Sequence, residues 1–145
     1  MKKQDYNASI TVAATAKEVF KNINSVSTWW TEDLEGSSRN LHDEFTVRFG
    51  EVHVSKQKLV EVIQDRKVVW LVTDSRLNFI EDKHEWTNTK ISFEISNHDA
   101  KTQINFTHVG LVPQVECYHA CVQGWDHYIK GSLLKLLTEG KGTPG

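Results

Sequence analysis

One long amphipathic segment near the end of the 145-residue chain constrains its fold more than any other feature. When Tyr118 is set at zero and each residue advances by ~100°, the apolar residues of this segment share an arc of ~120°. They are Cys121, Val122, Trp125, Ile129, Leu133 and Leu136. A helix with one apolar face along its whole length must bury that face against a surface of similar length. The rest of the chain has to supply such a surface.

The residues before this helix supply strands. Apolar and polar residues alternate over 6–12, 45–49, 91–95 and 104–108, which predicts half-buried strands. The continuous apolar run 68–72 is typical of a central strand. Two short helices follow the first strand. One begins at the capping-box spacing of Thr15 and Glu18, and the other carries Trp29 and Trp30.

This order of elements predicts an α+β fold. We expect a strongly bent antiparallel sheet of about six to seven strands, wrapped around the long C-terminal helix, with the two short helices after the first strand. Residues 1–138 are expected to form a single domain, because the length suits one core. Residues 139–145, which are rich in glycine, are expected to form a flexible tail.

Charge and hydropathy exclude several classes of protein. The 17 Lys plus Arg residues nearly balance the 19 Asp plus Glu residues, so we expect no nucleic-acid partner. No apolar run approaches the roughly 18 residues of a membrane span, so we expect no membrane insertion. The start of the chain has no signal-peptide pattern, and the only cysteines are Cys117 and Cys121. These two features predict a reducing, cytoplasmic location.

Four pieces of the sequence, taken in order and spacing, resemble the START-like (SRPBCC) helix-grip superfamily. They are residues 16–30, which end in Trp29-Trp30; Glu85-Trp86 leading into 91–95; residues 102–111; and Gly124-Trp125 with 133–137. The resemblance covers about residues 5 to 138. It is nearest to the bacterial homologues of the heat-shock-protein ATPase activator.

The resemblance implies a cavity between the sheet and the long helix. In relatives, this cavity accepts hydrophobic molecules, and a minority of the superfamily are enzymes such as cyclases and dehydratases. The eukaryotic namesake of the nearest family stimulates a chaperone ATPase with the help of a separate N-terminal domain. The chaperone role is therefore not carried over on the resemblance alone.

Most of the large aromatic residues fall where the pattern faces this interior. Aromatic residues are typical of ligand pockets, although they also dominate ordinary cores. Because Trp29 and Trp30 are adjacent, we expect one to pack inward and the other to cap the cavity entrance. The predicted ligand-binding cavity is lined by Trp29, Trp30, Phe45, Val47, Trp70, Trp86, Phe93, Phe106, His108, Tyr118, Val122 and Trp125.

His108 is the polar candidate in this set, because it continues the inward parity of Ile104 and Phe106. An inward histidine can orient a ligand oxygen or act as an acid or base near neutral pH. The alternative is a histidine whose hydrogen bonds are satisfied within the fold. Spacing identifies no acid partner for it. The histidines expected to be solvated, in loops or on outward strand positions, are His42, His53, His84 and His98.

Two other groups of residues have ordinary structural interpretations. Cys117, His119, Cys121 and His127 diverge around a helix, whereas a structural zinc site needs four converging ligands. We therefore expect no metal and no cofactor, with Cys121 packed as a small buried thiol. The interleaved charges from Glu81 to Glu85 predict a solvated turn.

The sequence contains no Gly-x-Ser-x-Gly, Walker-type or His-Glu-x-x-His motif, and so no clear catalytic motif. We therefore favour a protein that binds a small hydrophobic molecule in an aromatic-lined cavity. One alternative is a module that interacts with a chaperone or another protein. The other is a cyclase- or dehydratase-type enzyme that uses His108. The motifs assign no reaction, no ligand and no oligomeric state.

Overall fold

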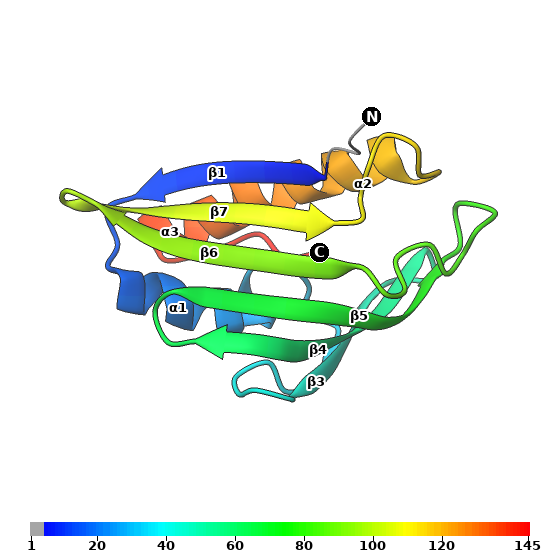
Figure 1. Ribbon diagram of the computed structural model, residues 1–145, viewed down its shortest axis with the longest axis horizontal. Coiled ribbons are helices and arrows are strands. Elements are labelled where there is room, and N and C mark those ends of the chain that lie inside the picture. The colour runs from blue at the N-terminus through cyan, green and yellow to red at the C-terminus, as the bar shows by residue number, and fades with distance from the viewer. Residues whose placement is uncertain (1–4) are drawn as a thin grey trace.

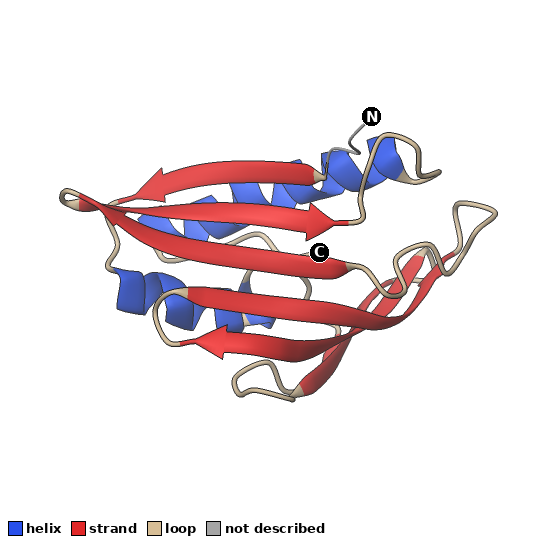
Figure 2. Ribbon diagram, viewed as in Figure 1, coloured by secondary structure: helices blue, strands red, loops and turns tan. Residues whose placement is uncertain are grey.

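The computed structural model describes residues 5–145, in which one curved sheet lies in front of a layer of helices (Figure 1, Figure 2). The sheet has seven antiparallel strands in the order β1-β7-β6-β5-β4-β3-β2. Their bounds are β1 Tyr6–Val12, β2 Leu34–Gly36, β3 Glu44–Phe49, β4 His53–Ile63, β5 Lys67–Leu77, β6 Lys90–His98 and β7 Lys101–Val109. The predicted bent antiparallel sheet of about six to seven strands is confirmed.

Two short helices, α1 (Ala16–Asn24) and the 3-10 helix η1 (Val26–Thr28), follow β1 as predicted. The side chain of Thr15 caps α1 by accepting a hydrogen bond from the Glu18 N–H at 3.1 Å. The long C-terminal helix is continuous over three segments: α2 (Tyr118–Trp125), the π-helical η2 (Asp126–Leu133) and α3 (Leu134–Glu139). It runs behind β1 and β7 (Figure 1).

The inner face of the sheet and the apolar face of the long helix form the core. Alternate residues are buried along both β1 and β7. On the helix, four of the residues predicted to face inward are buried, while Val122 and Leu136 are only partly buried. The four are Cys121, Trp125, Ile129 and Leu133. The long C-terminal helix therefore packs as the periodicity of its apolar residues predicts.

Strand β4 bends where its register with β5 shifts, between Lys56 and Gln57 and again between Leu59 and Glu61. Such irregularities bend a strand and increase its twist. The first of these shifts lies near His53, where β4 begins. The β3–β4 and β5–β6 connections meet there, because the Asn78 N–H donates to the Val52 carbonyl at 2.9 Å.

The segment after α3 returns to the domain. The Thr143 N–H donates to the Ser132 hydroxyl at 2.8 Å, and the Gly145 N–H donates to the Trp30 carbonyl at 2.9 Å. We expected residues 139–145 to lie outside the fold, but residues 142–145 pack against it. The glycines explain the difference, since Gly142 lies so close to the Thr28 carbonyl that a Cβ there would be 2.5 Å from it.

Among residues 5–145, no helix is both long enough and apolar enough to cross a membrane.

Candidate ligand-binding site

The interior between sheet and helix is filled mainly by its own aromatic side chains. Phe106 lies 4.6 Å from Trp125, and Phe45 lies 5.0 Å from Trp70, measured between ring centroids. Most of the predicted lining residues are fully buried in this cluster: Trp29, Phe45, Val47, Trp70, Phe93, Phe106 and His108. They fill the space that the resemblance implied to be a cavity, and they do so by edge-to-face and stacked contacts.

Trp29 and Trp30 both point inward, which contradicts the expectation that one of them caps the entrance. Their exposed fractions are 0% and 2%, and their rings stack at 6.2 Å. Alternation of neighbouring side chains applies to extended strands. Trp29 instead follows the 3-10 turn η1 with φ −133° and ψ −26°, so successive side chains can lie on the same side.

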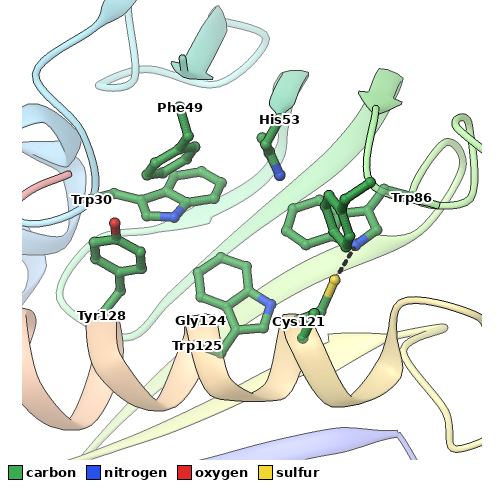
Figure 3. A pocket seen from close by; sticks show the side chains of 10 residues that line it. Trp30, Phe49, His53, Trp86, Cys121, Gly124, Trp125 and Tyr128 are labelled. Atoms are coloured by element: carbon green, nitrogen blue, oxygen red, sulfur yellow. Dashed lines mark hydrogen bonds between the residues drawn. The ribbon is translucent and has the colours of Figure 1, made fainter. Parts of the chain in front are cut away.

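A cavity of about 150 Å³ remains at one end of this cluster, between the long helix and the β3–β4 connection (Figure 3). It is lined by Trp30, Phe49, His53, Phe79, Trp86, Ala120, Cys121, Gly124, Trp125 and Tyr128. Six of these ten side chains are aromatic rings of Trp, Phe or Tyr. The lining is therefore apolar on nearly every side, as is typical of small-molecule sites.

Gly124 explains why the space stays open on the helix side. A Cβ placed on Gly124 would meet no atom within 4 Å. Trp125, the next residue, stacks at 5.0 Å on Trp30 and at 5.7 Å on Trp86. The cavity thus lies beside a stack of three indoles and opposite a helix position that has no side chain.

Only Trp30, Trp86 and Trp125 of the twelve predicted residues line this cavity. The other nine lie in the core or, for Tyr118 and Val122, are partly buried on the helix. Residues that the sequence reasoning missed include Phe49, His53, Phe79 and Tyr128. Phe49 shares the alternation of β3, which was a usable signal. Phe79 follows β5 in an irregular loop, where no period applies.

His53 was expected to be solvated, but it lies partly buried at the cavity. Its ring packs edge-to-face on Trp86 at 4.7 Å, and its Nε2 lies 2.8 Å from the Ser55 hydroxyl. Burial lowers the pKa of His53 to about 4, so the ring is neutral near pH 7. The misassignment has a simple cause, because His53 is the first residue of β4 and lies beside a turn. Of the other three histidines, His42 and His84 are exposed as expected, and the side chain of His98 is outside the described part.

His108 is inward, as predicted, but both of its ring nitrogens are already used. Its Nδ1 accepts from the Trp125 indole N–H at 3.0 Å. Its Nε2 donates to the Thr89 hydroxyl at 2.8 Å, and that hydroxyl donates in turn to the Trp86 carbonyl at 2.6 Å. Burial, and secondarily the nearby His53, lowers the pKa of His108 to about 3. His108 therefore fixes Trp125 and the loop of Trp86, and it does not line the cavity.

The two cysteines are buried thiols near the cavity. The Trp86 indole N–H donates to the Cys121 sulfur at 3.3 Å, shown as the dashed line in Figure 3. A hydrogen bond with Cys121, together with burial, raises the pKa of the Cys117 thiol. Within residues 5–145, no three His, Cys, Asp or Glu side chains are grouped so as to hold a metal ion. The pair helps to hold Trp86 in place.

Two carboxylates fasten the loop between β5 and β6 to the start of α2. Glu85 accepts from the N–H groups of Glu116 and Cys117 at 2.8 and 2.9 Å. Glu116 accepts in the reverse direction from the N–H groups of Glu81 and Asp82 at 2.9 and 3.1 Å. The hydrogen bond from Glu81 is the main reason that the pKa of Glu116 is lowered. We expected residues 81–85 to form a solvated turn, but Glu85 also binds the backbone of the turn that precedes α2.

Replacing Glu85 with alanine is expected to lower the free energy of unfolding by about 1–2 kcal/mol. The reason is that two N–H groups in the turn before α2 lose their acceptor. Urea denaturation measures the change. The matched control is Glu81→Ala in the same loop, whose exposed side chain should contribute less than about 0.5 kcal/mol. Equal losses in the two variants would contradict the role of Glu85 in holding this turn.

Comparison with known proteins supports the fold. No family model and no curated protein matches the sequence. Among solved structures, the Aha1 dimer from Colwellia psychrerythraea is similar, with a TM-score of 0.77, 22% identity and coverage of 96% of this chain and 99% of that one.

Two proteins known by locus names are similar as well. MLL2253 from Mesorhizobium loti has a TM-score of 0.74 at 11% identity and covers 92% of this chain and 96% of its own. SSP2350 from Staphylococcus saprophyticus has a TM-score of 0.72 at 14% identity and covers 97% and 96%. Identities this low carry information on fold only. The chain therefore has the helix-grip fold of the Aha1 homologue from Colwellia, as its resemblance in sequence predicts.

Proposed function

We propose that this protein binds a small apolar molecule in the cavity between Trp30, Trp86 and Trp125. The observation that supports this proposal best is a mainly aromatic lining around an unfilled space that is partly open to solvent, with Gly124 on the helix side. The neighbouring aromatic side chains of the core, such as Trp29, Trp70 and Phe93, are fully buried, so the proposed site lies at one end of the aromatic cluster. The proposed function is the one expected from the sequence, binding of a small apolar molecule, but the proposed site lies at one end of the interior.

The volume limits the size of the occupant. The cavity measures about 150 Å³, whereas sites for drug-sized ligands usually measure about 300–1,000 Å³. A dry apolar cavity of roughly 150 Å³ is large enough to take up benzene. We therefore expect the buried part of the ligand to be about one aromatic ring. A larger substituent would extend toward solvent past Phe79, whose side chain is 45% exposed.

An enzyme that uses His108 has little support, because both ring nitrogens are hydrogen-bonded within the fold. A chaperone or other protein partner, the absence of a nucleic-acid partner and a cytoplasmic location stay predictions.

The proposal is tested by filling the cavity from Gly124. Toluene is expected to bind the unaltered protein, raise its melting temperature and change its tryptophan emission, because three indoles line the site. Gly124→Leu places a side chain in the open space and should weaken toluene binding at least tenfold. The same change should stabilise the helix by up to about 1 kcal/mol, since glycine is a poor helix former.

Gly131→Leu is the matched control. Gly131 lies on the same helix, is exposed and is absent from the cavity lining. The Gly131→Leu variant should therefore gain similar helix stability and bind toluene as the unaltered protein does. Absence of toluene binding in the unaltered protein, or equal binding in the two leucine variants, would overturn the proposal.

A further inference from the structure

A polar track leads along the inner face of β4 to the cavity. Gln57, Ser55 and His53 are alternate residues of this strand, so their side chains share one face. The Gln57 amide Nε2 donates to the Ser55 hydroxyl at 2.6 Å, and this hydroxyl lies 2.8 Å from His53 Nε2. A serine hydroxyl has one proton to donate. Because Ser55 accepts from Gln57, its proton is left for His53 Nε2.

This track determines where His53 carries its proton. With Nε2 accepting from Ser55, a neutral imidazole must hold its single proton on Nδ1. The ring is neutral near pH 7 because burial lowers the pKa of His53 to about 4. Among the residues that the structure describes, none accepts a hydrogen bond from Nδ1. The ring projects into the space between Trp30 and Trp86 (Figure 3).

Among the described residues, the lining offers the His53 N–H as a donor and the Tyr128 hydroxyl as a donor or acceptor. No carboxylate or carboxamide side chain belongs to its lining. The Cys121 sulfur already accepts from the Trp86 indole N–H. The Nδ1–H of His53 faces this space without a partner among the described residues, so an acceptor on a ligand bound there would pair with it. The surrounding indole and phenyl faces favour a flat ring.

We propose that the occupant is an aromatic carbonyl compound of about one ring, whose oxygen accepts a hydrogen bond from His53 Nδ1. This inference rests on the proposed function and names its ligand class. The aromatic ring of the ligand packs among Trp30, Trp86 and Trp125, and its carbonyl oxygen points toward β4. Gln57 and Ser55 act as positioning residues, because they set the tautomer of His53 without touching the ligand.

Two probes of matched shape test the inference: acetophenone, which has a carbonyl oxygen, and α-methylstyrene, which has a CH₂ group in its place. His53→Phe keeps a ring at this position and removes the donor. We expect this variant to bind acetophenone about tenfold more weakly than the unaltered protein does, which corresponds to one buried hydrogen bond. Binding of α-methylstyrene should change less than twofold. Trp emission titrations at pH 7 measure both.

The outcomes separate the two proposals. If neither probe binds the unaltered protein, the proposed function fails. If both probes bind and His53→Phe weakens them equally or not at all, the function stands and the carbonyl inference is overturned. The ring nitrogens supply a measurement that needs no ligand, because ¹⁵N-resolved NMR at pH 7 distinguishes the tautomers. The Nδ1–H form supports the inference, and the Nε2–H form in the free protein overturns it.

Discussion

Replacing Trp125 with alanine is expected to lower the free energy of unfolding by about 4–5 kcal/mol. Removing a buried tryptophan typically costs about 3–5 kcal/mol, because the surroundings collapse only partly into the space left behind. Trp125 is 2% exposed, and its ring lies 4.6 Å from Phe106 and 5.0 Å from Trp30. Its indole N–H is also the partner of His108 Nδ1, which would lose its hydrogen bond inside the core.

Chemical denaturation followed by far-ultraviolet circular dichroism measures this loss. A domain of this size can have less stability than Trp125→Ala removes, so Trp125→Phe is needed beside it. Phenylalanine keeps most of the ring packing and removes the N–H group, and the expected loss is about 1–3 kcal/mol. If both variants cost less than 1 kcal/mol, Trp125 does not organise the core as the contacts indicate.

The fold could be predicted from the sequence because its signals are local and periodic. Alternation over residues 6–12 and 104–108 identifies two half-buried strands, which the structure pairs as β1 and β7. The helical periodicity from Cys121 to Leu133 identifies one buried face. Once a long apolar helix face has only a sheet to cover it, few arrangements remain. No pattern in the sequence predicted the π-helical segment η2, in which the polar Ser132 is buried beside Leu133.

The site was harder to predict, because its residues come from places where no period applies. Phe79 and Trp86 lie in the loop between β5 and β6, and His53 begins a strand directly after a turn. Their common location depends on how that loop is fastened, through Glu85 and the start of α2. Gly124 leaves the cavity open because it lacks a side chain. A pattern of residue types does not predict where such an empty space will lie. An aromatic residue predicted to face inward can equally well fill a core, as Trp70 and Phe93 do.

Stability is expected to fall by about 4–5 kcal/mol between pH 6.5 and pH 3 through His108 alone. In the unfolded chain this histidine has a pKa near 6.5, and burial in the fold lowers it to about 3. Above pH 6.5 both states hold a neutral ring, so the contribution to stability is complete. As pH falls below 6.5, the unfolded state binds a proton that the folded state does not, at a cost of about 1.4 kcal/mol per pH unit. The loss ends near pH 3, where the folded state is protonated too.

The hydrogen bonds of His108 also predict that its protonation destabilises the fold. A proton on Nδ1 of His108 would face the indole N–H of Trp125, so that two donors would oppose each other. His53 adds a smaller effect in the same direction, because its pKa is also lowered but its side chain is partly exposed to solvent. Carboxylates with lowered pKa values, such as Glu116, also stabilise the fold less as pH falls. The total slope therefore needs a comparison that isolates His108.

That comparison is His108→Asn, which cannot titrate in this range and offers its Oδ1 as an acceptor for Trp125. We expect the variant to be less stable at pH 7, because the smaller side chain leaves space and loses the bond to Thr89. Its free energy of unfolding should nevertheless depend on pH less steeply, by about 1 kcal/mol per pH unit between pH 6 and pH 4. The control is the exposed His42, because His42→Asn makes the same substitution outside the core and should change the slope less than His108→Asn does. Equal slopes in His108→Asn and the unaltered protein would show that His108 is not held neutral by the fold.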